Sequence, residues 1–535
     1  MTLIDGSNVT IGHLGIVAGM YDTLEIGQYI DEVIPKTRHH KITHGTAVKA
    51  LSLNGLGYNE GRLSLMPDFF EDIATERLLG PGIKPEHLNE YVFGETLDAI
   101  AEYGPTRLFT GIVLRMMDRL PLGVQRLHHD TTSINVTGEY DREFKTRLIE
   151  IVHGHSKDHR DDLKQFVISL VTNQDGIPVF MEPLSGNVSD KKSLLTSIRA
   201  VRTNLDTTHQ TIYHMADSAF YTSGNIQSLG RHCFWISHVP LTITEAQELV
   251  ASEISWTACK DIRYKYAVYE STYGGIPQRW VLFHSAEQQK RIDATFLTRL
   301  ENQMKKDNTA LKKLCAKGCA CEPDARAVVE RWHTRNPRYG IEDLVVTSEQ
   351  RRKSGKRGRP LKDELCEVVY RISGNLALDE AWIRREQEHA GRFILASNDT
   401  SIAPETLLEY YKEQSSVERG FRFLKDKRFH VSEVYLKNEN RIAALSMLMV
   451  LCLLLYSVAE WWFRKILKDR NATVMNPRNK PTARPTMKRV FFLFRRVRQV
   501  LERVDSTVHC RLLNVNDEVI RISGLLGADY GKYYS

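Results

Sequence analysis

Three strand patterns in a row constrain the fold more than any other part of the chain. Residues 123–136 and 163–172 are rich in apolar and β-branched residues. The tetrapeptide NQDG at 173–176 is a strong turn signal, and residues 177–184 return as a third strand. The sequence therefore predicts three antiparallel strands.

The elements that follow extend these strands into an α/β fold. A helix cap at Ser189 or Asp190 precedes a helical segment, and two more strand patterns occupy residues 211–217 and 232–240. Three antiparallel strands, a helix and two further strands give an α/β order. Asp217 closes the fourth strand, at the carboxyl end, where α/β sheets tend to bind ligands.

Asp130 stands in the middle of the first strand, where an acid is unfavourable. Strands disfavour Asp, and side chains alternate along a strand, so Asp130 shares a face with Ile134 and Val136. A carboxylate on an apolar face is costly unless it is paired. The partner is a cation from elsewhere in the fold or a bound metal. The sequence of the strand does not distinguish between these two alternatives.

The chain of 535 residues is too long for one ordinary core, and its patterns divide it into regions. Residues 1–118 form an expected helical N-terminal domain, and residues 119–240 the first part of the α/β core. Residues 241–401 hold strands, a long charged helix over about 286–316 and a basic loop, so this insertion of 161 residues is expected to be a subdomain. Two further regions complete the chain: the second part of the core, 402–465, and a basic C-terminal region, 466–535.

A helical pattern over residues 404–426 carries a third acid of interest. Four of its residues, at offsets of 0, 3, 7 and 14, fall on one stripe of an unbroken helix: Tyr411, Gln414, Glu418 and Lys425. Arg422 lies one turn beyond Glu418, and Glu413 points to the opposite side.

The three acids Asp130, Asp217 and Glu418 suggest metal chemistry if they meet. Carboxylates brought together repel each other unless a cation neutralises them, and oxygen ligands select Mg²⁺ or Mn²⁺. Two such ions can activate a water and stabilise the leaving oxygen in phosphodiester cleavage. Tyr411, Arg422 and Lys425 would extend the site toward a phosphate backbone. The residues alone also allow a paired strand acid, a helix cap and a helix-surface acid.

Basic blocks point to a polyanionic partner. Residues 351–362 hold seven Lys and Arg and no acid, and residues 461–500 hold twelve against one acid. Within the first block, RGRP matches the core of an AT-hook, whose Arg357 and Arg359 would enter a narrow minor groove. Sequence-independent DNA contact and a plain solvated surface are the alternatives.

Location in the cell is predicted from two observations. Eight scattered cysteines make no disulfide framework, and the N-terminus lacks the pattern of a signal peptide, so a cytoplasmic protein is expected. Residues 442–459 are 18 uncharged residues, at the lower limit for a membrane span. A buried core helix is the favoured interpretation, with a membrane anchor as the alternative.

The motifs around the three acids resemble those of bacterial insertion-sequence transposases of the IS4-related superfamily, closest to the IS1634 type. HHDTTS is similar to the region of the first catalytic Asp, MADSAFYTSGNI to the second, and YKEQSSVERGFRFLK to the region of the Glu. The resemblance covers nearly the whole chain. It implies a ribonuclease-H-like core interrupted by a mostly β insertion, and here Glu418 follows Asp217 by 201 positions.

The same resemblance implies roles for single residues. Asp130, Asp217 and Glu418 would be the catalytic acids and the ligands of two Mg²⁺ (or Mn²⁺) ions. The superfamily pattern near the Glu is Tyr-x2-Arg-x3-Glu-x6-Lys, and Gln414 replaces its Arg here. Arg419 or Arg422 would have to supply the missing positive charge.

The implied activity is metal-dependent cleavage at the insertion-sequence ends and transfer of the strands to target DNA, of the cut-and-paste type. The implied partner is double-stranded DNA, both at the ends of the insertion sequence and at the target. A homodimer is expected in the DNA complex, and no membrane is expected as a partner. The expected setting is the cytoplasm of a bacterium or archaeon, at the nucleoid when the enzyme is active. A ribonuclease-H-like nuclease without strand transfer, and a catalytically inactive DNA-binding descendant, are the competing interpretations.

Overall fold

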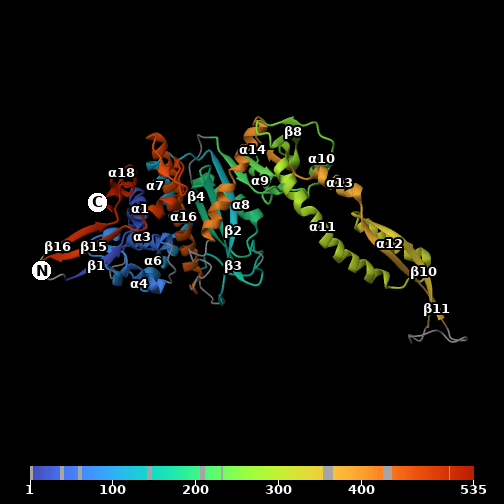
Figure 1. Ribbon diagram of the computed structural model, residues 1–535, viewed down its shortest axis with the longest axis horizontal. Coiled ribbons are helices and arrows are strands. Elements are labelled where there is room, and N and C mark those ends of the chain that lie inside the picture. Colours follow the sequence, from blue (N-terminus) through green and yellow to red (C-terminus); the bar gives the residue numbers. More distant parts are fainter. Residues whose placement is uncertain are drawn as a thin grey trace. The chain divides into compact units, whose positions relative to one another are not determined.

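The computed structural model divides the chain into two compact units (Figure 1). It describes residues 4–36, 41–57, 63–140, 147–158, 160–204, 211–230, 233–352, 366–425, 436–504 and 507–535. Unit 1 consists of Met1–His238, Ser271–Gln278 and Ser397–Ser535, and unit 2 of Val239–Glu270 and Arg279–Ala396. The protein is a mixed α/β protein with a large mixed sheet, which confirms the predicted fold class at that level.

The sheet of unit 1 has the strand order β4-β3-β2-β5-β6. Its strands are β2 (Arg126–Val136), β3 (Lys164–Asn173), β4 (Pro178–Ser185), β5 (Tyr213–Ala216) and β6 (Phe234–His238). The first three pair antiparallel, whereas β5 is parallel to β2 and β6 is parallel to β5. The predicted turn is present, since the Gly176 N–H donates to the Asn173 carbonyl at 2.9 Å and Gly176 has φ +77°. All five predicted strands are confirmed.

Helices cover both faces of this sheet. Two of them follow the meander: α8 (Asp190–Asn204) and α9 (Ser223–Leu229). His129 of β2 hydrogen-bonds Ser197 of α8 through its Nδ1 at 2.9 Å, which places α8 on the face of His129. Leu170 pairs with Asp130 in the neighbouring strand and lies against Gly420. Because side chains alternate along β2, Asp130 therefore faces the opposite side, toward the helix that contains Gly420.

The predicted continuous helix over 404–426 is wrong at its centre. The structure has two helices, α14 (Pro404–Lys412) and α15 (Ser415–Leu424). Between them the Gln414 N–H donates to the Tyr411 carbonyl and the Val417 N–H to the Gln414 carbonyl, at 3.1 and 3.0 Å. Bonds between residues three apart wind the chain more tightly than an α-helix does, and they separate the segment into two helices.

The N-terminal part of unit 1 is a cluster of helices. Its α-helices are α1 (Leu14–Thr23), α2 (Ile26–Val33), α3 (His44–Leu56), α4 (Met66–Glu71), α5 (Thr75–Leu79), α6 (Glu90–Tyr103) and α7 (Pro105–Arg119), with 3₁₀ turns η1 (Leu63–Leu65) and η2 (Pro85–His87). Thr43 and Asn89 cap α3 and α6 with their side chains, which satisfies backbone N–H groups at the start of each helix.

The apolar segment 442–459 lies within α16 (Glu439–Asp469). This helix contacts α1, α3, α6, α7 and β4, and 83% of its most apolar window is buried inside the protein. Its length and composition would suffice to cross a membrane, but a single helix of this kind, when buried, is weak evidence for a span. The observed burial is that of a core helix, packed between the N-terminal helices and the sheet.

The end of the chain returns to its beginning. Its elements are β13 (Val474–Met475), β14 (Pro481–Thr482), α17 (Met487–Phe494), β15 (Arg498–Val504), β16 (Thr507–Leu513), α18 (Asp517–Leu526) and α19 (Ala528–Gly531). Strand β1 (Ile4–Thr10) pairs antiparallel with β15, and β15 with β16, so the three lie side by side (Figure 1). The expected helical N-terminal domain thus includes a strand that the local sequence did not predict.

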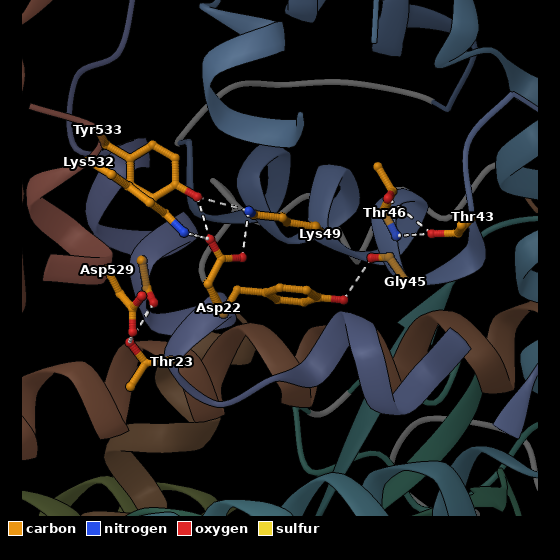
Figure 2. Close-up of polar contacts among 11 residues, drawn as sticks. Asp22, Thr23, Thr43, Gly45, Thr46, Lys49, Asp529, Lys532 and Tyr533 are labelled. Carbon is orange, nitrogen blue, oxygen red and sulfur yellow. Dashed lines mark hydrogen bonds and ion pairs between the residues drawn. The ribbon is translucent and has the colours of Figure 1, made fainter. Parts of the chain in front are cut away.

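Residues near the C-terminus, Lys532 and Tyr533, also contact the N-terminal helices (Figure 2). Asp22 of α1 accepts hydrogen bonds from Lys49 of α3 at 2.7 Å, from Lys532 at 2.7 Å and from the hydroxyl of Tyr533 at 2.5 Å. Burial by itself would raise the pKa of Asp22, but these three partners outweigh it and hold the pKa below its ordinary value. The C-terminus is therefore an integral part of the N-terminal helical cluster.

Unit 2 contains four strands paired in the order β12-β9-β8-β7 and a separate pair, β10-β11. Its strands are β7 (Thr257–Ala258), β8 (Tyr264–Ser271), β9 (Gln278–Ser285), β10 (Tyr339–Arg352), β11 (Cys366–Leu378) and β12 (Arg392–Ser397). Its helices are α10 (Thr244–Ala251), α11 (Ala286–Cys315), α12 (Glu322–Arg335) and α13 (Glu380–His389). The 3₁₀ turn η3 (Tyr273–Gly275) belongs to unit 1. Strands β10 and β11 form a long antiparallel hairpin, against which α11 and α12 pack. The predicted long charged helix is confirmed as α11.

Candidate active site

Asp130 is largely buried in the middle of β2, and its side chain is 18% exposed. Burial raises the pKa of this carboxyl to about 6, the positive charge of Lys157 opposes the rise, and the negative charge of Asp217 adds to it. The partner that the strand position demands is therefore present as a cation, because Nζ of Lys157 lies 3.3 Å from Oδ1 of Asp130.

Asp217 reaches the same place from the neighbouring parallel strand. Strands β2 and β5 are in register at His129 and Ala216, so Asp130 and Asp217 are each the next residue along. Oδ1 of Asp217 accepts a hydrogen bond from the N–H of Ala219 at 3.0 Å. The backbone carbonyl of Asp217 accepts one from the hydroxyl of Ser237 at 2.9 Å. These bonds fix the chain as it leaves β5, with the carboxylate close enough to Asp130 for the two charges to interact.

Glu418 belongs to α15, which packs on β2 and β3. Its neighbour in the site is Tyr411 at the end of α14. Burial raises the pKa of Tyr411 to about 12, and the negative charges of Asp217 and Glu418 contribute to this rise. The structure therefore brings Asp130 next to Asp217, and Tyr411 lies within the electrostatic influence of both Asp217 and Glu418.

The donor set fits a hard divalent ion in chemistry, although the side chains are not gathered around a point. Among the described residues, no group of three or more His, Cys, Asp and Glu side chains is close enough to hold a metal ion. Burial and the charge of Asp217 both disfavour the ionised form of Asp130, and a cation beside the two aspartates would favour it. Carboxylates as the only donors suit Mg²⁺ or Mn²⁺.

An ion pair joins the strand of Asp130 to the chain just before Glu418. Nε of Arg126 lies 2.7 Å from Oε2 of Glu413, and the same oxygen is 3.6 Å from Nε2 of the fully buried His128. The guanidinium of Arg126 also lies over the ring of Tyr410, 4.7 Å from its centroid. His128 thus packs between strand and helix, and burial lowers its pKa.

The remaining predicted DNA-contacting residues are spread over several places. Gln414 lies half-buried in the turn between α14 and α15, and Arg422 is exposed on α15. Lys425 caps α15 and donates to both carboxylate oxygens of Asp158 at 2.8 Å. Arg357 and Arg359 lie outside the described residues.

Two site residues were missed by sequence reasoning, namely Lys157 and Asp158. They belong to SKDHRDD, a polar segment that precedes β3. Its density of charge was the only available signal, and charged segments before strands are common on solvated loops. The contacts of Lys157 with Asp130 and of Asp158 with Lys425 depend on long-range folding.

Comparison with known families gives two matches on this chain. Residues 7–114, which include the N-terminal helices, match a domain of unknown function, DUF4277, that is typical of transposases. Residues 125–455, more than half of the chain and including Asp130, Asp217 and Glu418, match the transposase DDE domain. A search of curated proteins found no match. The chain therefore belongs to the family of DDE-domain transposases.

Proposed function

We propose that this transposase is an insertion-sequence enzyme of the IS4-related superfamily, closest to the IS1634 type. It would cut DNA at the ends of its element and join the freed ends to target DNA, by the cut-and-paste route. The observation that carries the proposal is the placement of the acids: Asp130 and Asp217 follow the paired residues His129 and Ala216 on neighbouring parallel strands, and the helix of Glu418 packs on the strand of Asp130. The charges of Asp217 and Glu418 both act on Tyr411.

A ribonuclease-H-like core is part of the proposal. It is supported by the sheet of unit 1, in which three antiparallel strands are followed by two parallel ones. Asp130 lies mid-strand and Asp217 at the carboxyl end of the adjacent parallel strand, which is where α/β sheets bind ligands. The insertion proposed for residues 241–401 would separate this pair in sequence from Glu418.

Asp130, Asp217 and Glu418 would hold two Mg²⁺ or Mn²⁺ ions. When bound, such ions lower the pKa of a water and stabilise the charge on the leaving oxygen. A water would then attack the phosphodiester at the end of the element, and the 3′-oxygen would leave as a 3′-hydroxyl. That hydroxyl, on losing its proton, would attack the target phosphodiester in line and displace the 3′-oxygen of the target strand. Tyr411, protonated at neutral pH, would donate a hydrogen bond beside Asp217 and Glu418.

The proposed partner is double-stranded DNA, both at the element's ends and at the target. Arg422, exposed on α15, would contact the phosphate backbone and replace the charge missing at Gln414. The N-terminal helical domain would bind the ends, and Arg357 and Arg359 would add minor-groove contacts. Because paired ends must be cut together, the complex would contain a homodimer, acting at the nucleoid in the cytoplasm.

The deciding experiment uses the full-length protein and duplexes carrying the sequences that flank its gene. The wild type should nick these duplexes only with Mg²⁺ or Mn²⁺, and should join the freed 3′ end to plasmid DNA. Asp130→Asn, Asp217→Asn and Glu418→Gln should each abolish both steps while leaving duplex binding intact. Glu409→Gln, an exposed acid on α14, is the matched control and should retain activity.

The same assay separates the competing functions. A nuclease of the same fold would nick the duplex and never join a 3′ end to the plasmid. An inactive DNA-binding descendant would bind the duplex and show no metal-dependent nicking in the wild type. Full activity in any of the three acid variants would overturn the proposed site.

A further inference from the structure

The segment before β3 places the ammonium group of Lys157 beside Asp130, a proposed metal ligand. Nζ of Lys157 donates to the Thr131 carbonyl at 2.7 Å, to the Thr131 hydroxyl at 2.9 Å and to Oδ1 of Asp130 at 3.3 Å. An ammonium is a compact point charge that can stand where a metal ion would neutralise a carboxylate. Lys157 therefore occupies the electrostatic place of a cation next to Asp130.

This position is also held by hydrogen bonds of the Lys157 backbone and of the residue before it. The Lys157 N–H donates to the Ser133 hydroxyl at 3.1 Å, and the Ser156 hydroxyl donates to Oδ1 of Asn135 at 3.2 Å. Both acceptors belong to β2, so the segment runs along the strand that carries Asp130. The two bonds hold the start of the Lys157 side chain beside the strand.

The next residue, Asp158, places its carboxylate beside Lys425, a proposed DNA-binding residue. Both oxygens of Asp158 accept from Nζ of Lys425 at 2.8 Å. Lys425 caps the helix of Glu418, and it is the motif lysine expected to contact a phosphate. The Asp158 side chain is 43% exposed, and exposed ion pairs contribute little stability, so a phosphate can replace this carboxylate at small cost.

Resting on the proposed function, we propose that Lys157 and Asp158 are positioning residues that stand in for the metal and for the DNA phosphate before either binds. Lys157 gives Asp130 a positive partner, and Asp158 gives Lys425 a negative one. Metal then competes with Lys157 for Asp130, and DNA phosphate competes with Asp158 for Lys425. After this exchange Lys157 keeps its two bonds to Thr131.

The first test measures Mn²⁺ binding to the full chain by calorimetry, without DNA. Lys157→Met should bind Mn²⁺ several-fold more tightly than the wild type, because the competing charge is gone, and Lys157→Arg should stay close to the wild type. Lys157→Gln, which keeps a donor for Thr131, should behave as Lys157→Met and serves if the Met variant is unstable. In the Asp130→Asn background, the Lys157 substitution should change Mn²⁺ affinity little.

Equal or weaker Mn²⁺ binding by both neutral variants at Lys157 would overturn the metal half of the inference. This outcome is distinct from failure of the proposed function, which would appear as normal DNA cleavage by Asp130→Asn. A merely structural role of Lys157 would lower stability and weaken Mn²⁺ binding together, opposite to the expected change.

The second test measures binding of a short mixed-sequence duplex without divalent metal. Asp158→Asn should raise the affinity several-fold and should steepen the salt dependence by about one phosphate contact, because Lys425 becomes available. Asp162→Asn is the matched control, since it removes the same charge from an exposed pair with Arg160 at 2.8 Å in the same segment. Lys425→Met should cancel the gain.

Equal affinities of Asp158→Asn and Asp162→Asn would overturn the phosphate half of the inference, because the gain would then reflect net charge alone. A gain that survives Lys425→Met would overturn it as well. Neither result depends on cleavage activity, so the proposed function is judged separately.

Discussion

Arg126 and Glu413 form an ion pair, 2.7 Å from Nε to Oε2, that connects the two parts of the proposed site. Arg126 begins the strand that carries Asp130, and Glu413 precedes the helix that carries Glu418. About a quarter of each side chain is exposed, so the pair is partly shielded from water. The distance between the strand and the helix therefore depends on a contact that itself takes no part in the chemistry.

Glu413→Gln tests this connection. The substitution keeps the shape and removes the charge, so we expect a loss of about 1–2 kcal/mol in the free energy of unfolding, measured with urea. DNA cleavage should fall by at least about tenfold, because small displacements of reacting groups are costly. Glu409→Gln is the control for charge, and unchanged cleavage in Glu413→Gln would show that the pair does not position the site.

Tyr411 gives a prediction for pH. Its pKa is raised from 10.0 to about 12, so its contribution to stability is fully present below pH 10 and is lost as the pH rises through about 12. The difference in phenolate absorbance between the wild type and Tyr411→Phe should therefore titrate near pH 12. A midpoint near pH 10 would mean that neither burial nor the carboxylates act on this hydroxyl.

The same variant predicts a change in activity. Tyr411→Phe removes one hydrogen-bond donor from a half-buried site next to Asp217 and Glu418. We expect cleavage to fall by about tenfold, equivalent to about 1.4 kcal/mol in the barrier. Because the hydroxyl is protonated throughout, the ratio of the two rates should not vary between neutral and mildly alkaline pH.

The lowered pKa of Asp22 gives a prediction for how acid affects its contact with Lys532 and Tyr533. Its lowered pKa means that the carboxylate stabilises the fold above its ordinary pKa of 3.8, and that this stability is lost as the pH falls through the lower folded value. Asp22→Asn should cost about 1–2 kcal/mol at neutral pH, and the deficit should shrink in acid. Asp529→Asn, an exposed neighbour, should cost much less in the same urea titration.

The sequence predicts the strands of unit 1 well because local signals decide them. The NQDG turn fixes one hairpin, and apolar runs mark the other strands. The pairing of β1 with β15 escapes prediction because its partners lie at opposite ends of the chain. The break between α14 and α15 escapes it as well, because Glu413 and Gln414 keep helical backbone angles and give no local stop signal.

The candidate site is only partly accessible to sequence reasoning. An acid in mid-strand implies that Asp130 needs a partner, and the structure supplies Lys157 as a cation. The identity of this cation depends on how the segment before β3 folds along β2. The spacing of residues in the sequence does not predict that path. The catalytic roles of Asp130, Asp217 and Glu418 stay predictions, supported by the pairing of the two aspartate strands and by the packing of the Glu418 helix on β2.

The central claim is that Asp130, Asp217 and Glu418 share bound divalent ions, and cleavage of the protein by bound iron tests it most directly. Fe²⁺ can occupy oxygen-ligand sites of this kind, and with ascorbate and peroxide it breaks the chain near its ligands. In the full-length protein bound to its DNA ends, the account predicts breaks close to residues 130, 217 and 418, all of which disappear in Asp217→Asn. Breaks that spare the region of Glu418, or that persist in Asp217→Asn, would contradict it.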